Sequence, residues 1–243
     1  MKRKYINGVR LNSLPEKDSY LGGLPVVRHL AQRKELLFPK SVTFLVGENG
    51  TGKSTLLEAI AVAYGFNAEG GTRNFSFSTN PTHSELYRHL TLSRSAYPKD
   101  GFFLRAESFY NAASYIDEIG AAHNYGGRSL HKQSHGESFL SLMENRFSGN
   151  GLYLLDEPEA ALSPSRLMTL LVHIHALVQK NSQFIIATHS PILMAYPGAE
   201  VYLLTEDGIR SVGFQETEHY QLTRRFLENP EKMLHYLLEA DDV

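Results

Sequence analysis

The sequence contains no cysteine among its 243 residues. This absence excludes disulfide bonds, catalysis by a thiolate and zinc sites with cysteine ligands, and it is typical of a protein of the reducing cytosol, so we expect a cytoplasmic location. The chain also has no apolar run long enough to cross a bilayer. No apolar segment follows the basic residues at the start of the chain, as a signal peptide would require. We therefore expect no direct insertion into a membrane.

No charge of one sign dominates, because 24 lysines and arginines stand against 26 aspartates and glutamates, for a formal net charge of −2. The sequence therefore lacks the overall basic field that favours binding to nucleic acid. The short basic stretches at residues 2–4 and 224–225 are typical of a solvated surface. The length and the hydrophobic content of 42% fit one large α/β domain, or a core that carries a small lobe.

The segment VTFLVGENGTGKSTLLEAI, residues 42–60, carries the most informative pattern. Its first five residues are apolar or β-branched, which is typical of a buried parallel strand. The next eight match G-x-x-x-x-G-K-[ST], the phosphate-binding P-loop. The rest predicts a helix with an apolar stripe toward the sheet. A glycine-rich turn that matches by chance is the alternative, but the strand before and the helix after favour the P-loop.

Each residue type in this loop has a physical reason. Gly47, Gly50 and Gly52 allow backbone angles that a side chain forbids, and they let the main chain approach phosphate closely. The loop N–H groups and the positive end of the helix then surround an anion. Lys53 should reach the outer phosphates, and the Ser54 hydroxyl should bind Mg²⁺. The predicted nucleotide-binding residues of this segment are Gly47, Glu48, Asn49, Gly50, Thr51, Gly52, Lys53, Ser54 and Thr55.

Two further apolar runs end in polar residues suited to phosphate chemistry. Residues 152–155 predict a buried strand that ends in Asp156 and Glu157. Adjacent carboxylates at that position are costly to bury without a role. Asp156 suits Mg²⁺ binding, and Glu157 suits the polarisation of an attacking water. Residues 184–188 predict another buried strand, followed by His189. A histidine there lies where α/β sheets bind ligands, and it is able to bond a γ-phosphate or the attacking water.

Other segments predict structure around this core. Residues 1–41, 74–79 and 90–94 have the pattern of antiparallel strands in a small β lobe. Residues 201–204 and 209–212 predict a hairpin, and residues 216–228 and 230–240 predict two terminal helices. The pentapeptide SHGES, from Ser134 to Ser138, is a glycine-bearing turn before an amphipathic helix, whose N-terminus suits an anion.

Taken together, these motifs resemble the ATP-binding-cassette (ABC) ATPases along nearly the whole chain. GENGTGKS is similar to the Walker A motif, and Asp156 and Glu157 are similar to the Walker B aspartate and the catalytic glutamate. Residues 160–163 resemble the D-loop, and His189 resembles the switch histidine. SHGES resembles the signature motif, usually closer to LSGGQ, which implies that Ser134, Gly136 and Glu137 contact nucleotide. Glu107 lies where the family has the Q-loop glutamine, which implies a metal ligand.

The resemblance implies an α/β P-loop NTPase fold, with a mostly parallel central sheet flanked by helices and a small antiparallel β lobe. One domain then spans residues 1–243; residues 1–41 and 66–101 contribute to the lobe and residues 214–243 form C-terminal helices. Within the superfamily, the chain is most similar to small stand-alone bacterial ATPases of AAA type in the broad P-loop sense. These are grouped with the ATPase heads of SMC and recombination-repair proteins.

The implied function is binding and hydrolysis of ATP with Mg²⁺. In the family, two heads form a head-to-tail homodimer around two ATP molecules, and each site joins the P-loop of one head to the signature turn of the other. We expect a partner such as DNA or a nuclease. Two alternatives remain: the nucleotide-binding subunit of a membrane transporter, and a nucleotide-gated binding module with little turnover.

Overall fold

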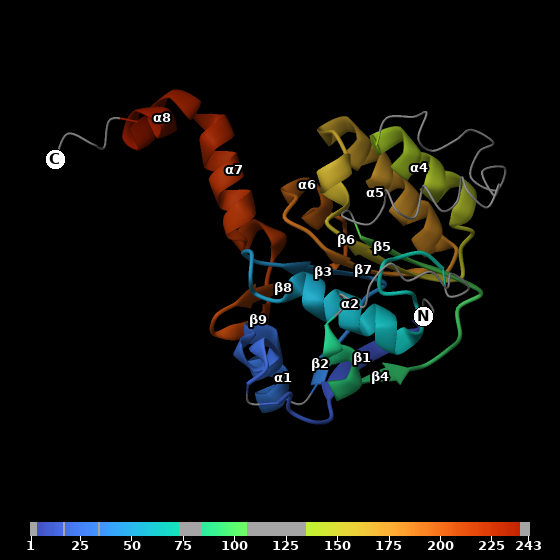
Figure 1. Cartoon of the computed structure of the whole chain (residues 1–243). Helices are drawn as coiled ribbons and strands as arrows, with labels where there is room; N and C mark the ends of the chain where they lie inside the picture. Colours follow the sequence, from blue (N-terminus) through green and yellow to red (C-terminus); the bar gives the residue numbers. More distant parts are fainter. Residues whose placement is uncertain (1–3, 17, 34, 73–83, 106–134, 239–243) are drawn as a thin grey trace.

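The computed structural model describes residues 4–16, 18–33, 35–72, 84–105 and 135–238. A six-stranded sheet with strand order β5-β6-β7-β3-β8-β9 lies at the centre (Figure 1). The strands are β3 (Val42–Val46), β5 (Asp100–Arg105), β6 (Gly151–Asp156), β7 (Gln183–Ala187), β8 (Glu200–Thr205) and β9 (Gly208–Ser211). Neighbouring strands are parallel except β8 and β9, which form the predicted antiparallel hairpin.

The three strands that lead to the predicted motifs are buried along their whole length. Every residue of β3, β6 and β7 is buried. Strands covered on both faces have near-continuous apolar sequences, which is why these runs were recognisable in the sequence. The predicted mostly parallel central sheet is therefore confirmed.

A smaller antiparallel sheet with strand order β2-β1-β4 lies below the central sheet in Figure 1. Its strands are β1 (Ile6–Leu11), β2 (Glu35–Leu37) and β4 (Leu90–Arg94). They confirm the predicted β lobe, and the helix α1 (Pro25–Arg33) connects β1 to β2. The predicted strand at residues 74–79 lies outside the described residues.

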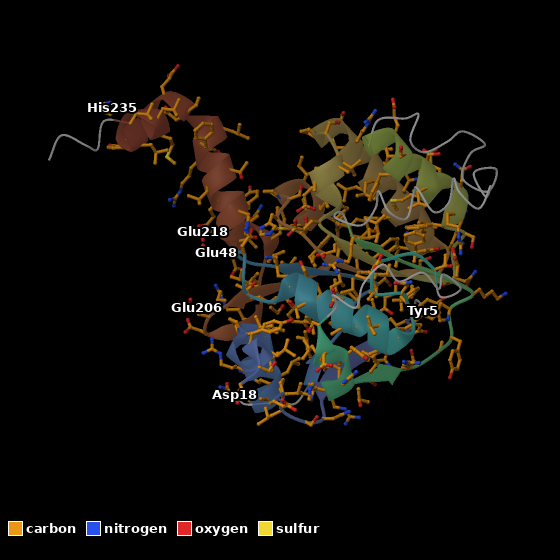
Figure 2. The ribbon with its side chains drawn as sticks, viewed as in Figure 1. Tyr5, Asp18, Glu48, Glu206, Glu218 and His235 are labelled. Carbon is orange, nitrogen blue, oxygen red and sulfur yellow. The ribbon has the colours of Figure 1, made fainter. Side chains whose placement is uncertain are left out.

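One buried side chain ties the two sheets together. Gln183, at the start of β7, donates from Nε2 to the carbonyl oxygen of Ile6 at 2.7 Å. Its Oε1 accepts the backbone N–H groups of Tyr5 and Ile6 at 2.7 and 2.9 Å. Figure 2 labels Tyr5, which immediately precedes β1. Because buried backbone groups need partners, this glutamine fixes where the antiparallel sheet starts against the central one.

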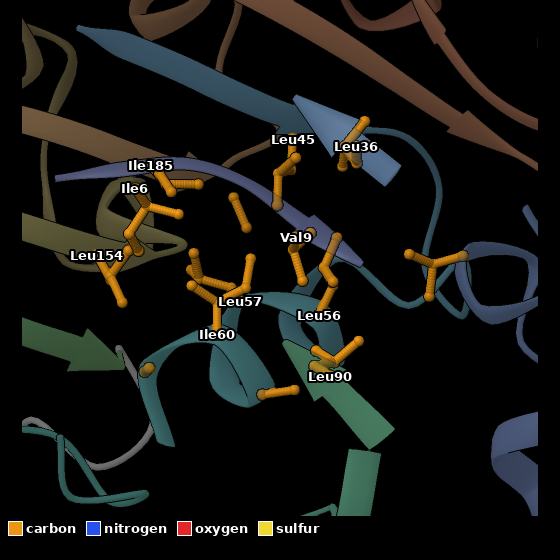
Figure 3. Packing of buried hydrophobic residues seen from close by; sticks show 14 of the residues in the cluster. Ile6, Val9, Leu36, Leu45, Leu56, Leu57, Ile60, Leu90, Leu154 and Ile185 are labelled. Atoms are coloured by element: carbon orange, nitrogen blue, oxygen red, sulfur yellow. The ribbon is translucent and has the colours of Figure 1, made fainter. Parts of the chain in front are cut away.

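Helix α2 (Lys53–Tyr64) lies between the two sheets and carries the core of this side (Figure 3). Its Leu56, Leu57 and Ile60 are fully buried. Their cluster also contains Leu45, Leu154 and Ile185 from the central sheet and Val9, Leu36 and Leu90 from the antiparallel sheet. A second cluster covers the other face of the central sheet with α4 (His135–Arg146), α5 (Pro164–Gln179) and α6 (Pro191–Met194).

After the hairpin, α7 (Glu218–Glu228) and α8 (Pro230–Leu238) project from the body of the protein as an arm (Figure 1). These helices confirm the two predicted terminal helices. Neither helix contains a buried residue, and Leu227, Leu237 and Leu238 are 72%, 67% and 74% exposed. Among the described helices, none combines the length and the apolar character that a membrane crossing needs.

Candidate nucleotide-binding site

The three predicted motifs follow strands that are neighbours in the central sheet. β7 lies between β6 and β3, with Ala187 beside Asp156 on one side and beside Leu45 on the other. All three strands are parallel, so their carboxyl ends meet at one edge. In open α/β sheets this edge is where ligands bind. Strand order thus assembles residues that are far apart in the sequence.

The P-loop leaves β3 in a conformation that requires glycine. Gly47 has a φ of +142°, and a Cβ atom there would lie 2.2 Å from the carbonyl oxygen of Leu204 in β8. Gly50 also has a positive φ of +82°, but no heavy atom lies within 4 Å of the Cβ position. The start of the loop is therefore packed against β8, and its tip is open.

Lys53 begins α2 and lies inside the curve of the loop. Its Nζ donates to the carbonyl oxygens of Gly47 and Glu48 at 2.7 and 2.8 Å. Burial lowers the pKa of the Lys53 ammonium, while the carboxylates of Glu157 and Asp156 favour its charged form. The helix N-terminus and this cation create a positive, partly enclosed site, which suits the phosphates of a nucleotide.

Ser54 and Asp156 meet directly, although 102 positions separate them in the sequence. Ser54 Oγ donates to Asp156 Oδ1 at 2.9 Å. A hydroxyl and a carboxylate side by side provide the hard oxygen ligands that Mg²⁺ prefers, with substrate phosphates and water as its other ligands. The described residues contain no cluster of three or more His, Cys, Asp or Glu side chains suited to a metal. The pair thus fits Mg²⁺ bound together with a phosphate.

Glu157 follows β6 in a strained backbone conformation. It has a φ of +48°, and its N–H donates to the carbonyl oxygen of Ala187 at 2.9 Å. A left-handed conformation is uncommon for glutamate, and such strain clusters at functional sites. Its Oε1 lies 3.5 Å from Nε2 of His189, an electrostatic contact longer than a hydrogen bond.

His189 is held at the end of β7 by its backbone and its ring. Its N–H donates to the Glu159 carboxylate, and its Nδ1 lies 2.9 Å from Nε2 of His219 on α7. Nothing in the sequence motifs indicated His219, because it lies 30 positions after His189 in a terminal helix. Only the path of the chain through β8 and β9 brings it to the site.

The histidines and one buried acid have perturbed pKa values. Burial lowers the pKa of His189, and the nearby Lys53 ammonium lowers it further. Burial and Lys53 lower the pKa of His219 in the same way. Burial raises the pKa of Glu159, against the hydrogen bond from the His189 backbone. Perturbed pKa values gathered beside a glycine-rich loop are typical of functional sites, so these groups are candidates for one.

The other predicted contacts lie elsewhere in the fold or outside the described residues. Gly136 and Glu137 form the first turn of α4, where Glu137 pairs with Arg166 at 3.2 Å. A Cβ atom on Gly136 would lie 2.8 Å from the carbonyl oxygen of Ala161. Ser134 and Glu107 lie outside the described residues. Within the P-loop, Thr51 Oγ1 donates to the Glu48 carbonyl oxygen at 2.9 Å, whereas Asn49 is exposed and Thr55 is half-buried.

Two families match parts of the chain. The family described as "AAA domain, putative AbiEii toxin, Type IV TA system" matches residues 133–195. A second, described as "AAA domain", matches residues 27–101. The first match contains the strands β6 and β7 with Asp156, Glu157 and His189, and the second contains the P-loop.

Similar proteins include two that are described as ATP-binding proteins. The "Ribose import ATP-binding protein RbsA" of Roseobacter denitrificans is 25% identical over 194 residues, which are 71% of this chain and 38% of that protein. The chain therefore spans well under half of that relative. An "Uncharacterized ABC transporter ATP-binding protein" of Haemophilus influenzae is 27% identical over 231 residues, covering 87% of this chain and 84% of that protein.

The fold also matches solved structures. A structure of cbiO1 from Clostridium perfringens, described as part of the ABC transporter complex cbiONQ, has a TM-score of 0.52 at 18% identity. The match covers 98% of this chain and 100% of that one. At this identity the likeness concerns the fold alone. Two parts of the chain therefore match AAA-domain families, and the overall fold is like that of this ABC transporter component.

Proposed function

We propose that this protein binds ATP with Mg²⁺ and hydrolyses it at the edge where β3, β6 and β7 end. One observation carries the proposal. Ser54, the residue after the P-loop lysine, donates from Oγ to Asp156 Oδ1 at 2.9 Å. A P-loop with its serine on a carboxylate is an arrangement suited to a nucleoside triphosphate and its metal ion. The named relatives are ATP-binding proteins, which agrees with this substrate.

The P-loop N–H groups and Lys53 would hold the phosphates, and Ser54 and Asp156 would hold Mg²⁺. The bound ion would offset the charge of the phosphate oxygens. The proposed nucleotide contacts are the sequence-predicted ones: Gly47, Glu48, Asn49, Gly50, Thr51, Gly52, Lys53, Ser54 and Thr55. The assignment of Glu107 as a further metal ligand stays a prediction.

Glu157 is the proposed general base, and His189 is the proposed donor to the γ-phosphate. The oxygen of a water attacks the γ-phosphorus, the bond from phosphorus to the ADP oxygen breaks, and the water proton goes to Glu157. The half-buried Glu157 side chain lies near His189 and within the field of Lys53, so its charge is positioned on the side of the proposed phosphates. The products are ADP and phosphate.

The same proposal includes a head-to-tail dimer formed with ATP. Gly136 and Glu137 lie at the N-terminus of α4, against Ala161 and Arg166. This location fits residues that complete the site of a second copy. The γ-phosphate bridges the two copies and ADP lacks it, so hydrolysis would weaken the dimer. A DNA or nuclease partner stays a prediction, tested by the ATPase rate with and without double-stranded DNA at defined salt.

Steady-state phosphate release by the wild-type protein and by Glu157→Gln tests whether the protein hydrolyses ATP. Loss of a general base lowers the rate by about 10²- to 10⁴-fold. Glu157→Gln should also form a dimer with ATP and Mg²⁺ in size-exclusion chromatography, because the γ-phosphate that bridges the two copies is not cleaved. Equal, negligible rates of the two proteins would instead identify a nucleotide-gated binding module. A persistent monomer would contradict the dimer.

A second candidate function is the nucleotide-binding subunit of a membrane transporter. The observation in its favour is the Haemophilus influenzae relative, named as a transporter ATP-binding protein and matched over 87% of this chain. Co-purification from native membranes with a permease subunit would support this function. Recovery of the tagged protein without any membrane subunit would count against it.

A further inference from the structure

We propose that His219 is a positioning residue, which holds His189 in the tautomer with its proton on Nε2. This inference rests on the proposed role of His189 toward the γ-phosphate. The contact itself is direct, because Nε2 of His219 lies 2.9 Å from Nδ1 of His189. When two neutral imidazoles share a hydrogen bond, one nitrogen donates and the other accepts, so the direction of this bond sets both tautomers.

The surroundings of Nε2 of His189 show which direction of the hydrogen bond to His219 is favoured. Nε2 of His189 lies 3.5 Å from Oε1 of Glu157. A proton on Nε2 faces this carboxylate favourably, whereas a lone pair on Nε2 would face negative charge. With its proton on Nε2, the neutral ring accepts at Nδ1, so His219 is the donor.

The far nitrogen of His219 gives the same answer when its surroundings are compared with those of Nε2 of His189. Nδ1 of His219 is buried and has no hydrogen-bond partner within the described part of the chain. If His219 accepted at Nε2, its proton would be on Nδ1 as a buried donor without an acceptor, which is rare and costly in proteins. If His219 donates from Nε2, the donor without a hydrogen bond is Nε2 of His189 instead, and that donor faces the Glu157 carboxylate at 3.5 Å.

The start of α7 is anchored well enough to place this donor. Thr217, immediately before α7, is fully buried, and its Oγ1 donates to the carbonyl oxygen of Phe214 at 2.6 Å. The same oxygen accepts the N–H of Tyr220 at 3.4 Å and caps the helix. His219 is thus held in the first turn of a capped helix, although no residue of α7 or α8 is buried.

The groups around the pair keep it neutral near neutral pH. Burial and the Lys53 ammonium lower the pKa of both histidines, while Glu157 acts in the opposite sense on His189. Glu218 and Glu48 oppose the shift on His219, and Figure 2 labels both near the foot of α7. A neutral His189 that donates from Nε2 is prepared to bond a phosphate oxygen without a change of tautomer.

Nitrogen NMR of histidine-labelled, nucleotide-free protein tests the tautomer directly. His189 is assigned by its loss in His189→Gln. We expect a proton on Nε2 of His189 in the wild type and in His219→Gln, whose side-chain amide is also a donor. In His219→Leu, only the Glu157 carboxylate still favours the proton on Nε2, so we expect a measurable fraction of the Nδ1 tautomer beside it. An Nδ1 proton in the wild type, or an unchanged tautomer in His219→Leu, would overturn the proposal.

ATP hydrolysis adds the functional measurement. We expect His219→Leu to lower kcat by about tenfold, with little change of KM, as is usual when a residue that orients a catalytic histidine is removed. His219→Gln should restore most of the rate. His235→Leu is the matched control, because His235 is an exposed histidine on α8. If His219→Leu does not fold, His219→Asn, whose amide is too short to reach, replaces it.

The outcomes separate this inference from the proposed function. An active wild type with an unchanged kcat in His219→Leu would overturn the positioning role and leave the ATPase intact. An inactive wild type whose His189 tautomer still depends on His219 would support the hydrogen-bond assignment and overturn the ATPase.

Discussion

The edge of the sheet where β3, β6 and β7 end differs sharply from the arm formed by α7 and α8. At the sheet edge, Lys53 and Ser54 are held by hydrogen bonds from side chain to loop or strand, and the strands beneath them are fully buried. Along the arm no residue is buried, and leucines point into solvent. Side chains that do chemistry need a packed support, because a loosely held side chain does not keep its geometry.

The two regions meet at the foot of α7. There His219, in the first turn of the arm, reaches His189 at the sheet edge. Substitutions on one side of this junction should therefore affect one region and leave the other intact.

The largest effect should come from filling the space at Gly47. A Cβ atom there would lie 2.2 Å from the Leu204 carbonyl oxygen, in a backbone conformation with a φ of +142°. Strain and overpacking together should lower the free energy of unfolding by about 3 kcal/mol or more in Gly47→Ala. Gly50→Ala is the matched control, since its site is open at φ +82°, and should cost about 1 kcal/mol. Urea denaturation measures both; equal losses would contradict the packing argument.

Lys53→Ala should next weaken ATP binding by about 100-fold, because a buried ammonium beside the phosphates is removed. The fold should persist, as the change shortens a side chain without altering the core clusters. Isothermal titration calorimetry measures the affinity. Lys232→Ala on the exposed arm is the control and should bind ATP as the wild type does. Unchanged affinity of Lys53→Ala would contradict the proposed phosphate site.

Acidification should loosen the junction between the two regions. Burial lowers the pKa of both His189 and His219, so the folded protein binds fewer protons there than the unfolded chain. Their neutral forms therefore stabilise the fold above about pH 6.5, and this contribution is lost as the pH falls through the lowered folded-state pKa. Stability of the wild type should fall more steeply with acid than that of His219→Leu. Parallel pH profiles would show that the pair does not contribute.

The smallest effect should follow a change on the arm. Leu227 is 72% exposed, so Leu227→Ser removes little buried surface and should change stability by no more than about 0.5 kcal/mol. Leu57→Ser, in the core beneath the P-loop, is the contrasting variant and should unfold the protein far more readily. Thermal melts compare the two. A large loss of stability in Leu227→Ser would mean that the arm packs against the body in solution.

Much of the fold and the gathering of the motifs could be predicted from the sequence. Residues 42–46, 152–155 and 184–188 are apolar runs because their strands are covered on both faces, and such local patterns are readable. Asp156 could be expected near Ser54, because the P-loop and the carboxylates each follow a predicted parallel strand and such strands end at one edge of the sheet. Glu107 and Ser134 lie outside the described residues, so their predicted roles stay predictions.

Other features were not readable, because they depend on contacts between distant segments. Gln183 precedes the predicted strand at residues 184–188, and its amide bonds the backbone of Tyr5 and Ile6, more than 170 positions away. The antiparallel lobe was expected from strand patterns, but its attachment to the central sheet through one side chain was not. No local periodicity encodes such a bond, since it exists only once both sheets are packed.

The P-loop, the buried strands and the polar residues that follow them are visible in the sequence, because each depends on neighbours within a few positions. The contact between His219 and His189 arises only when the chain is folded. That contact depends on how β8 and β9 turn the chain and on where buried Thr217 starts α7, and neither leaves a periodic trace in the sequence. The direction of the histidine hydrogen bond then follows from the charges around it.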